Sequence, residues 1–397
     1  MKKKYIVTFI TCLVMLAGFF IVFRIINPSA DRDTIKVGFI YDNDESTAYT
    51  YNFSLAKDAL EKKYGDRIQI YTSSNVLDDE MEEPLRKLAV NGCDIIFFNG
   101  YSEMVKELAD EYPNTQFCQT SYMDMNGVSV PENYHTFKGE AYQGRYVSGI
   151  AAGMKIKQLI SDGIIGEEDA LVGFVAAFPT SEVISGYTAF ILGVRSIVPQ
   201  AVMKVAYTNT WSSYAHEKSA AQQLINDGCV IISQHTDTIG PAIACEETPQ
   251  KKAVYFVGYN QSMSEVAPMT SLVTSRICWE PYVLGAVEAV MNNKKIEKVV
   301  QGNVNGNDIA AGYEFGWVET IDLNLQACAP GTQQAMDVAI DKFKRGHNDF
   351  VFKGDYTGTN PENISDKISL KNGYIENENT SYPTFHYILD DVITILK

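Results

Sequence analysis

Two short sequence patterns occur twice in this chain, and the two pairs keep almost the same spacing. The tripeptide Val-Gly-Phe at 37–39 returns at 172–174, an offset of 135 residues. The segment Leu-Ala-Val-Asn-Gly-Cys-Asp-Ile-Ile at 88–96 returns as Leu-Ile-Asn-Asp-Gly-Cys-Val-Ile-Ile at 224–232, an offset of 136. Each copy combines an apolar strand with a later helix, a glycine stop and a second strand. The repeat predicts a duplicated α/β unit, whose two lobes enclose a cleft.

The expected elements alternate between strands and helices in both copies. The strands are almost continuously apolar, which favours parallel sheets covered by helices. We therefore predict an α/β fold with two doubly wound parallel-sheet lobes and a hinge. The expected division is 1–33 for an N-terminal anchor and linker, 34–146 plus about 255–300 for the first lobe, and 147–254 plus about 301–397 for the second. Strands are expected at Ile35–Tyr41, Ile68–Thr72, Asp94–Phe98, Phe117–Tyr122, Leu171–Ala177, Met203–Tyr207, Val230–Ser233, Ala253–Gly258 and Leu272–Ser275, and helices near Tyr49–Tyr64, Glu82–Asn91, Glu103–Glu111, Glu182–Ile197, Tyr214–Asp227, Ile239–Glu247 and Pro281–Asn292.

The N-terminus carries the pattern of a membrane anchor. Three lysines precede Tyr5–Phe23, an uncharged run of 19 residues, and Arg24 follows it. At about 1.5 Å per residue the run spans roughly 28 Å, close to the thickness of a bilayer core. We expect a signal anchor in the cell membrane, with the lysines cytoplasmic and the binding domain extracytoplasmic. Cleavage after Pro28-Ser29-Ala30 and lipidation at Cys12 are the alternatives, although both sites match their consensus poorly.

Composition and motifs exclude several classes of function. The net charge of −16 disfavours nucleic acid as a partner. The sequence has neither a phosphate-binding glycine motif, nor His-Glu-x-x-His, nor a Gly-x-Ser-x-Gly elbow. Gly144, Gly149 and Gly153 recur at a spacing that suits close helix packing. We therefore expect a non-enzyme with no catalytic residues, no metal site and no cofactor.

Seven cysteines are present, and none is arranged in a Cys-x-x-Cys pair. Cys93 and Cys229 occupy matching repeat positions before apolar strands, which indicates small buried side chains. A disulfide between two of the other cysteines is an alternative that the sequence leaves open.

Aromatic and polar residues follow many of the predicted strands. In parallel sheets the loops after the strands form the ligand site. Aromatic walls with a few polar groups suit a planar, hydrogen-bonding small molecule. Trp211, Trp279 and His235 each also have a purely structural reading, and Asp237 is as well explained as a helix cap. The candidate ligand-binding residues are Asp44, Tyr49, Asn52, Asn99, Tyr101, Phe178, Trp211, His235, Asp237, Asn260 and Trp279.

Several stretches resemble a known family. Phe137-Lys-Gly-Glu-Ala-Tyr-Gln-Gly144 through Gly153, Val172–Gln200, Thr208–Trp211, Ile231–Asp237 and Val257–Met263 are similar to segments of the basic membrane protein family of substrate-binding lipoproteins, which includes purine nucleoside receptors. The likeness covers nearly all of residues 35–320. It implies a type I periplasmic-binding-protein fold, hinged closure and delivery of a nucleoside-like solute to the permease of an ABC importer.

The chain departs from the family pattern at two places. Asn260 and Ser262 stand in a loop where the family commonly has an aspartate that resembles a ribose-hydroxyl acceptor. An amide accepts fewer hydrogen bonds than a carboxylate, which favours a free base or another heteroaromatic ligand. An apolar anchor replaces the lipobox. We expect a monomeric solute-binding protein; a membrane-anchored sensory module and a nucleoside hydrolase are the alternatives.

Overall fold

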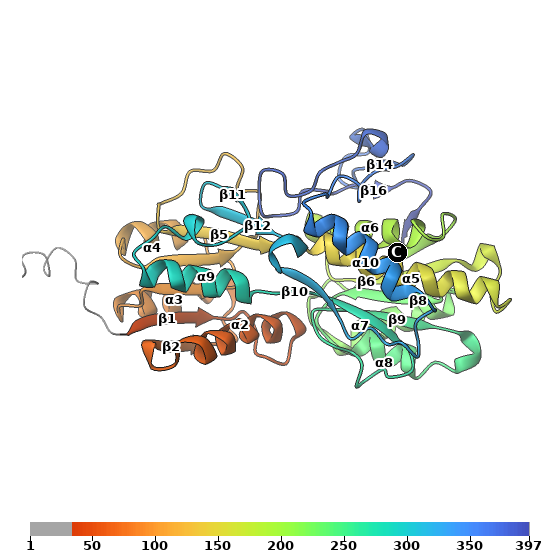
Figure 1. The fold of residues 1–397 in the computed structure, drawn as a ribbon, viewed down its shortest axis with the longest axis horizontal. Coiled ribbons are helices and arrows are strands. Elements are labelled where there is room, and N and C mark those ends of the chain that lie inside the picture. Colours follow the sequence, from red (N-terminus) through yellow and green to blue (C-terminus); the bar gives the residue numbers. More distant parts are fainter. Residues whose placement is uncertain (1–33, 397) are drawn as a thin grey trace, which may run out of the picture.

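The computed structural model describes residues 34–396, which form two lobes side by side along the longest axis of the molecule (Figure 1). The expected membrane anchor lies outside the described residues. Within residues 34–396, no helix is long and apolar enough to cross a membrane.

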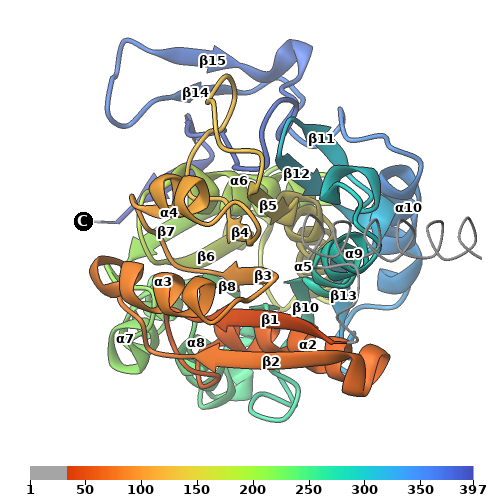
Figure 2. The same ribbon diagram turned by 90° about the vertical axis from the view of Figure 1, so that its left-hand side faces the viewer.

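The first lobe, which lies nearest the viewer in Figure 2, is built on a seven-stranded sheet. Helices α2 and α9 cover one face, and α3 and α4 cover the other. The strands follow the order β11-β12-β5-β4-β3-β1-β2, and only the β11–β12 pair is antiparallel. The elements are β1 (Ile35–Ile40), α2 (Ala48–Tyr64), β2 (Ile68–Ser73), α3 (Glu82–Val90), β3 (Ile95–Phe98), α4 (Val105–Glu111), β4 (Gln116–Thr120), β5 (Tyr134–Gly139), α9 (Glu280–Met291), β11 (Asn303–Asn305) and β12 (Asp308–Ala311).

The second lobe repeats this plan. Its sheet has the order β13-β10-β9-β8-β6-β7-β17, so the five central strands follow the same winding as β5-β4-β3-β1-β2 of the first. Helices α5 and α6 pack on one face, and α7 and α8 on the other. The elements are α5 (Ala141–Ser161), β6 (Leu171–Ala176), α6 (Ser181–Arg195), β7 (Val202–Tyr207), α7 (Tyr214–Asn226), β8 (Ile231–His235), α8 (Gly240–Glu246), β9 (Tyr255–Tyr259), β10 (Ser271–Ile277), β13 (Val318–Ile321), α10 (Thr332–Lys344) and β17 (Ile393–Ile395).

The sequence repeat corresponds to one packing motif in each lobe. A Cβ placed on Gly38 of β1 would lie 2.7 Å from the Leu88 side chain of α3, and one on Gly173 of β6 would lie 2.9 Å from Leu224 of α7. In both places the missing Cβ leaves room for a leucine of the helix against the strand. The duplicated α/β unit is therefore confirmed.

The chain passes between the lobes three times, and these crossings lie side by side. They are 139–141, 277–280 and 311–318. The Glu140 backbone N–H donates to the Ala311 carbonyl oxygen at 2.8 Å, and the Cys278 N–H donates to the Trp317 carbonyl oxygen at 2.8 Å. Three adjacent segments joined in this way connect the lobes, at the place where the hinge is expected.

The crossings correct the expected division of the chain in two ranges of residues. Residues 255–277 were expected in the first lobe, but β9 and β10 pair with β8 in the second sheet. Residues 303–311 were expected in the second lobe, but β11 and β12 extend the first sheet. The reason is that the repeat continues for five strands in each lobe. The chain returns to the first lobe only after the fifth strand of the second, β10.

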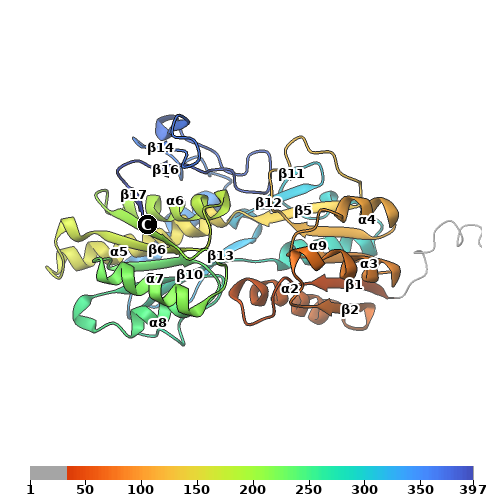
Figure 3. The same cartoon turned by 180° about the vertical axis from the view of Figure 1, so that it is seen from behind.

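The part of the chain after α10 lies along one side of both lobes (Figure 3). It carries a small sheet made of β14 (Thr357–Thr359), β15 (Lys367–Ser369) and β16 (Ile388–Leu389). Phe352 and Phe385 are fully buried and stack with ring centroids 4.7 Å apart. This aromatic packing attaches the C-terminal region to the core of the second lobe.

The six cysteines within the described residues are buried, and none of them forms a disulfide. Burial raises the pKa of the Cys93 thiol to about 11 and that of Cys229 to about 12, which keeps both thiols protonated. These cysteines act as small apolar side chains, as their repeat positions predicted.

Helices α5 and α6 cross at two glycines. A Cβ on Gly149 would overlap the carbonyl oxygen of Phe190, and a Cβ on Gly193 would overlap the carbonyl oxygen of Tyr146. The expectation that the glycines of the helical stretch serve close packing is confirmed.

Replacing Gly149→Ala is expected to lower the free energy of unfolding by about 1–3 kcal/mol, because the backbones cannot separate without opening the core. Urea denaturation followed by circular dichroism measures this loss. Lys157→Ala, at an exposed position of the same helix, is the control and should leave the midpoint unchanged. Equal midpoints for both variants would contradict the packing role of the glycines.

Candidate ligand-binding site

The two lobes meet around a cavity of about 70 Å³ at the carboxyl ends of their parallel strands. This is the edge at which ligands bind to open parallel sheets. A volume of this size has room for a few water-sized groups, so a larger ligand requires the bridging side chains to move. The lining residues are Asp42, Tyr49, Tyr122, Lys138, Glu182, Trp211, His235, Asp237, Tyr259 and Asn260.

The first lobe contributes four side chains from three strand ends and one helix start. Asp42 follows β1, Tyr122 follows β4, and Lys138 lies near the end of β5. Tyr49 stands in the first turn of α2. The hydroxyl of Tyr122 donates to the Asn99 carbonyl oxygen at 2.7 Å, which fixes the orientation of its ring.

The second lobe contributes most of an aromatic wall. The Trp211 ring packs edge-on against Phe178 at 5.4 Å between centroids, and it remains 39% exposed. His235 lies at the end of β8. Its ring centroid is 6.3 Å from that of Trp211 and 4.5 Å from that of Tyr259. The wall therefore combines indole, imidazole and phenol rings in one row.

An ion pair connects the lobes across the cavity. The Lys138 Nζ lies 2.8 Å from Oε2 of Glu182, which begins α6 in the other lobe. The same ammonium donates to the Ser121 carbonyl oxygen at 3.1 Å. A second interlobe contact comes from the Ala48 N–H, which donates to the Asp237 carbonyl oxygen at 3.2 Å. These bridges hold the cavity at its small volume.

The carboxyl groups of the cavity are held in an unfavourable environment. Burial raises the pKa of Asp237 well above its usual range, and the negative charges of Asp42, Glu217 and Glu182 raise it further. Burial also raises the pKa of Asp42, despite hydrogen bonds from Asn43 and Thr50 that oppose the shift. A ligand that brings N–H or O–H donors to these carboxyl groups relieves this cost.

His235 is neutral at neutral pH. Its pKa is lowered well below the usual value by burial and by the positive charges of Arg145 and Lys138. Among the described residues, its Nδ1 atom has no hydrogen-bond partner. The Arg145 guanidinium is buried behind the cavity wall, with its central carbon 3.5 Å from the Tyr259 ring centroid. Arg145 thus supports the wall and keeps the imidazole uncharged.

Five of the residues expected from the sequence line the cavity. The other six lie close to it or in the lobe cores. The five are Tyr49, Trp211, His235, Asp237 and Asn260; the six are Asp44, Asn52, Asn99, Tyr101, Phe178 and Trp279.

Two of the six are structural, which corrects the expectation for them. Trp279 is fully buried in the core of the first lobe, with its ring centroid 5.3 Å from that of Phe53. The Asn52 amide donates to the Ile277 carbonyl oxygen and so attaches α2 to a hinge crossing. Both residues flank the hinge, where strand ends and lobe cores meet. Their sequence surroundings do not show whether such a side chain faces the cleft or the core.

Three of the remaining four residues lie beside the cavity wall, and Asp44 does not. Asn99 accepts a hydrogen bond from the Asp42 N–H at 2.9 Å and so supports a lining residue. The Tyr101 ring packs beside that of Tyr122, with 6.0 Å between the ring centroids, and Phe178 packs beside Trp211 in a similar way. Asp44 sits on an exposed loop, away from the cavity lining.

Five lining residues were not among the candidates. Three of them stand in loops already expected to form the cleft. The other two, Lys138 and Glu182, form the interlobe ion pair. Lys138 was missed because residues 134–139 were not predicted as a strand, although β5 is buried along its whole length. The five are Asp42, Tyr122, Lys138, Glu182 and Tyr259.

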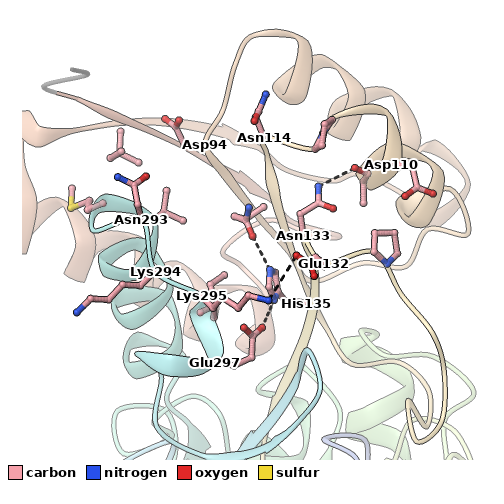
Figure 4. Close-up of a pocket in the computed structure, with 18 of the residues that line it drawn as sticks. Asp94, Asp110, Asn114, Glu132, Asn133, His135, Asn293, Lys294, Lys295 and Glu297 are labelled. Atoms are coloured by element: carbon pink, nitrogen blue, oxygen red, sulfur yellow. Dashed lines mark hydrogen bonds and ion pairs between the residues drawn. The ribbon is translucent and has the colours of Figure 1, made fainter. Parts of the chain in front are cut away.

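A larger hollow of about 660 Å³ lies at the opposite, amino-terminal edge of the first sheet (Figure 4). Its central side chain, His135, is bonded on both sides: Nδ1 lies 2.5 Å from Oε1 of Glu297, and Nε2 lies 2.9 Å from Oε1 of Gln116. The histidine has no free ring nitrogen for a ligand, and parallel sheets bind ligands at the other edge. We therefore place the candidate site in the interlobe cavity.

Replacing Asp237→Asn is expected to raise the Tm at neutral and alkaline pH. A carboxyl whose pKa is raised by folding loses stabilisation as the pH rises from its ordinary value of 3.8 through the raised value. The variant lacks this loss, so in thermal melts its advantage over the wild type should grow as the pH rises above 3.8. Asp58→Asn, on an exposed position of α2, should show no such pH-dependent gain. A Tm difference that stays constant with pH would refute the assignment.

Comparison with known proteins assigns the chain to a family. Residues 35–348 match the family described as PnrA-like ABC transporter substrate-binding proteins. A purine-binding protein of Brucella abortus is 27% identical over 265 residues, which cover 66% of this chain and 70% of the relative. A putative ABC transporter glucose-binding protein of Haloferax volcanii is 26% identical over 264 residues, covering 66% and 62%.

Solved structures agree on the fold. An ABC transporter solute-binding protein from Conexibacter woesei superposes with a TM-score of 0.59 at 16% identity, covering 79% of this chain and 98% of its own. The expected two-lobed periplasmic-binding-protein fold is therefore confirmed. The family match spans both lobes and the cavity between them, so the chain belongs to the PnrA-like substrate-binding proteins of ABC transporters.

Proposed function

We propose that this protein binds a nucleoside or a nucleobase-like heteroaromatic compound in the interlobe cavity. As a substrate-binding protein of an ABC transporter it is a binding protein rather than an enzyme, and it works outside the cytoplasm. We infer that the closed form presents its ligand to the permease. The observation that carries the choice of ligand is the aromatic wall of Trp211, His235 and Tyr259 facing buried carboxyl groups.

The wall suits a flat ring. Stacking between a base and an aromatic side chain contributes about 1–3 kcal/mol in nucleic-acid complexes. Tyr49 and Tyr122 add two further phenol rings from the first lobe. A planar heterocycle is accommodated by such surroundings better than a flexible peptide is.

The polar groups match the edge of a base. Asp42 and Asp237 accept hydrogen bonds from ring N–H and amino groups, and an amide such as Asn260 both donates and accepts. The imidazole of His235 belongs to the same lining, with its Nε2 atom 3.9 Å from Oε1 of Glu182. Because Asn260 replaces the expected carboxylate, we favour recognition through the base over recognition through ribose hydroxyls.

A hexose is the second candidate. One relative is named as a putative glucose-binding protein, and carboxyl groups also accept hydrogen bonds from sugar hydroxyls. The row of aromatic rings supports the heteroaromatic ligand, since a hexose presents no aromatic face. Direct binding measurements separate the two.

A thermal-shift panel of nucleosides, free bases and glucose is the experiment that tests the proposal. A ligand at about 100 times its Kd adds about 2.7 kcal/mol to the stability of the folded state. We expect a rise of several degrees in Tm with at least one purine or pyrimidine compound. A shift with glucose alone would replace the proposal with the hexose reading.

Replacing Trp211→Ala should weaken binding of the active compound at least tenfold, which is about 1.4 kcal/mol. The ring is partly exposed, so its loss should leave the Tm of the free protein nearly unchanged. Isothermal titration calorimetry measures the affinity. Tyr214→Ala is the control, because Tyr214 is 45% exposed nearby but does not line the cavity. Unchanged affinity in the Trp211 variant would exclude stacking on this ring.

A further inference from the structure

A loop of the C-terminal region spans the two lobes outside the hinge. Residues 376–385 follow the matched family segment, which ends at 348. Figure 1 shows this dark blue part of the chain passing from the second lobe toward β11 and β12 of the first. Its base and its tip are attached to different lobes.

The base of the loop is fixed to the second lobe. The Glu376 carboxylate accepts a hydrogen bond from the Ser185 hydroxyl of α6 at 2.6 Å. It also accepts from the backbone N–H groups of Thr384 at 2.6 Å and of Phe385 at 3.1 Å, which closes the two ends of the loop on each other. Glu376 and Phe385 are almost completely buried. The base is therefore a rigid part of this lobe.

The tip of the loop is bonded to the first lobe. The Ser381 N–H donates to Oδ2 of Asp308 in β12 at 2.6 Å. The Asn303 amide of β11 donates to the Asn377 carbonyl oxygen at 2.9 Å. The Met125 N–H donates to the Thr380 hydroxyl at 3.1 Å. These bonds come from three separate segments of the first lobe.

The tip is also held in shape internally. Asn377 adopts a left-handed backbone conformation with φ of 58°. Its side-chain amide donates to the carbonyl oxygens of Thr380 at 3.2 Å and Ser381 at 2.7 Å. Such bonds stabilise the turn independently of the other lobe. The tip can thus engage and release the first lobe as one body.

The loop contacts a residue that also supports the ligand cavity. The Ser381 hydroxyl bonds to the hydroxyl of Ser121, and the Ser121 carbonyl oxygen accepts from the cavity-lining Lys138. The Lys138 ammonium lies 5.5 Å from the centroid of the Tyr382 ring. The position of the loop tip and that of the Lys138–Glu182 ion pair are therefore coupled through shared contacts.

We propose that residues 376–385 form a latch that holds the lobes closed and positions the cavity-lining Lys138. Its contribution to ligand retention rests on the proposed binding in the cavity, whereas its contribution to closure does not. A hinge alone leaves the lobes free to open. A bond network far along the chain from the hinge crossings adds a second attachment, and this attachment must break before the cleft opens.

The latch variant combines Asn303→Ala with Ser381→Ala. These changes remove side-chain hydrogen bonds between the lobes and leave the base of the loop intact. The matched control combines Asn363→Ala with Ser365→Ala. Both control positions are exposed in the same C-terminal region. Their hydrogen bonds to described residues stay within residues 360–366.

Distances between the lobes are measured by pulsed electron paramagnetic resonance on the full chain without ligand. Nitroxide labels are attached at Lys87→Cys in α3 and Gln222→Cys in α7, both exposed positions, with Cys12→Ser removing the cysteine that lies outside the described residues. We expect a wider distribution shifted to longer distances for the latch variant, and the wild-type distribution for the control. Identical distributions for all three proteins would overturn the latch.

Release of guanosine, measured by stopped flow, is the second readout. The latch variant should release it at least several-fold faster than the control does. If guanosine binds to none of the proteins, this purine is not the ligand. The interlobe distances measured without ligand then decide whether the loop acts as a latch. Faster release with unchanged distances would refute closure by the loop.

A cross-link covers the case in which the latch variant unfolds. Ser121→Cys with Ser381→Cys places two thiols where the hydroxyls touch. Mild oxidation should join the two thiols in the folded protein. The distribution of distances between the lobes should then become narrower and contain only its shorter values. The pair Ser121→Cys with Ser365→Cys should not cross-link. Absence of a cross-link in the first pair would show that the tip does not dock on the first lobe.

Discussion

The arrangement of this protein depends on three chain crossings that lie against one another between the lobes. Backbone hydrogen bonds from Glu140 to Ala311 and from Cys278 to Trp317 join them in pairs. These bonds hold the three segments side by side, so the lobes are joined by one narrow strip of chain. The residues that line the cavity come from strand ends, from the segments that follow them and from the first turns of α2 and α6.

The cavity is formed where the two repeats differ. Inside the sheets, Gly38 and Gly173 serve the same packing role. At the strand ends the lobes diverge: one contributes Lys138, and the other contributes His235 and Trp211. The duplicated scaffold supplies two similar edges, and unlike side chains on these edges give a site to which both lobes contribute aromatic rings and carboxyl groups. The price is the burial of Asp237 and Asp42, a cost that a binding site retains when it serves the ligand.

Most of the fold follows from local sequence, and part of the site does not. Short apolar strands, glycine stops and the repeat predicted nearly all strands and helices of the five-stranded cores, since these depend on patterns within a few residues. The return of β11 and β12 to the first sheet depends on contacts between distant segments. Trp279 was misplaced for the same reason: a strand-end aromatic faces either the cleft or the core, and tertiary packing decides which. Lys138 was missed together with its strand.

The discontinuous first lobe has a consequence for how the chain folds. Its five central strands end at residue 139, but its core also contains Trp279, Tyr282 and Trp317, which follow the whole run of β6 to β10. A growing chain therefore carries the half-covered apolar side chains of Phe53, Phe97 and Phe137 until residues 279–317 have been made. Exposed apolar surface of this kind promotes aggregation. The first lobe is thus completed only after β6 to β10 of the second lobe have been synthesised, and its core stays incomplete during that interval.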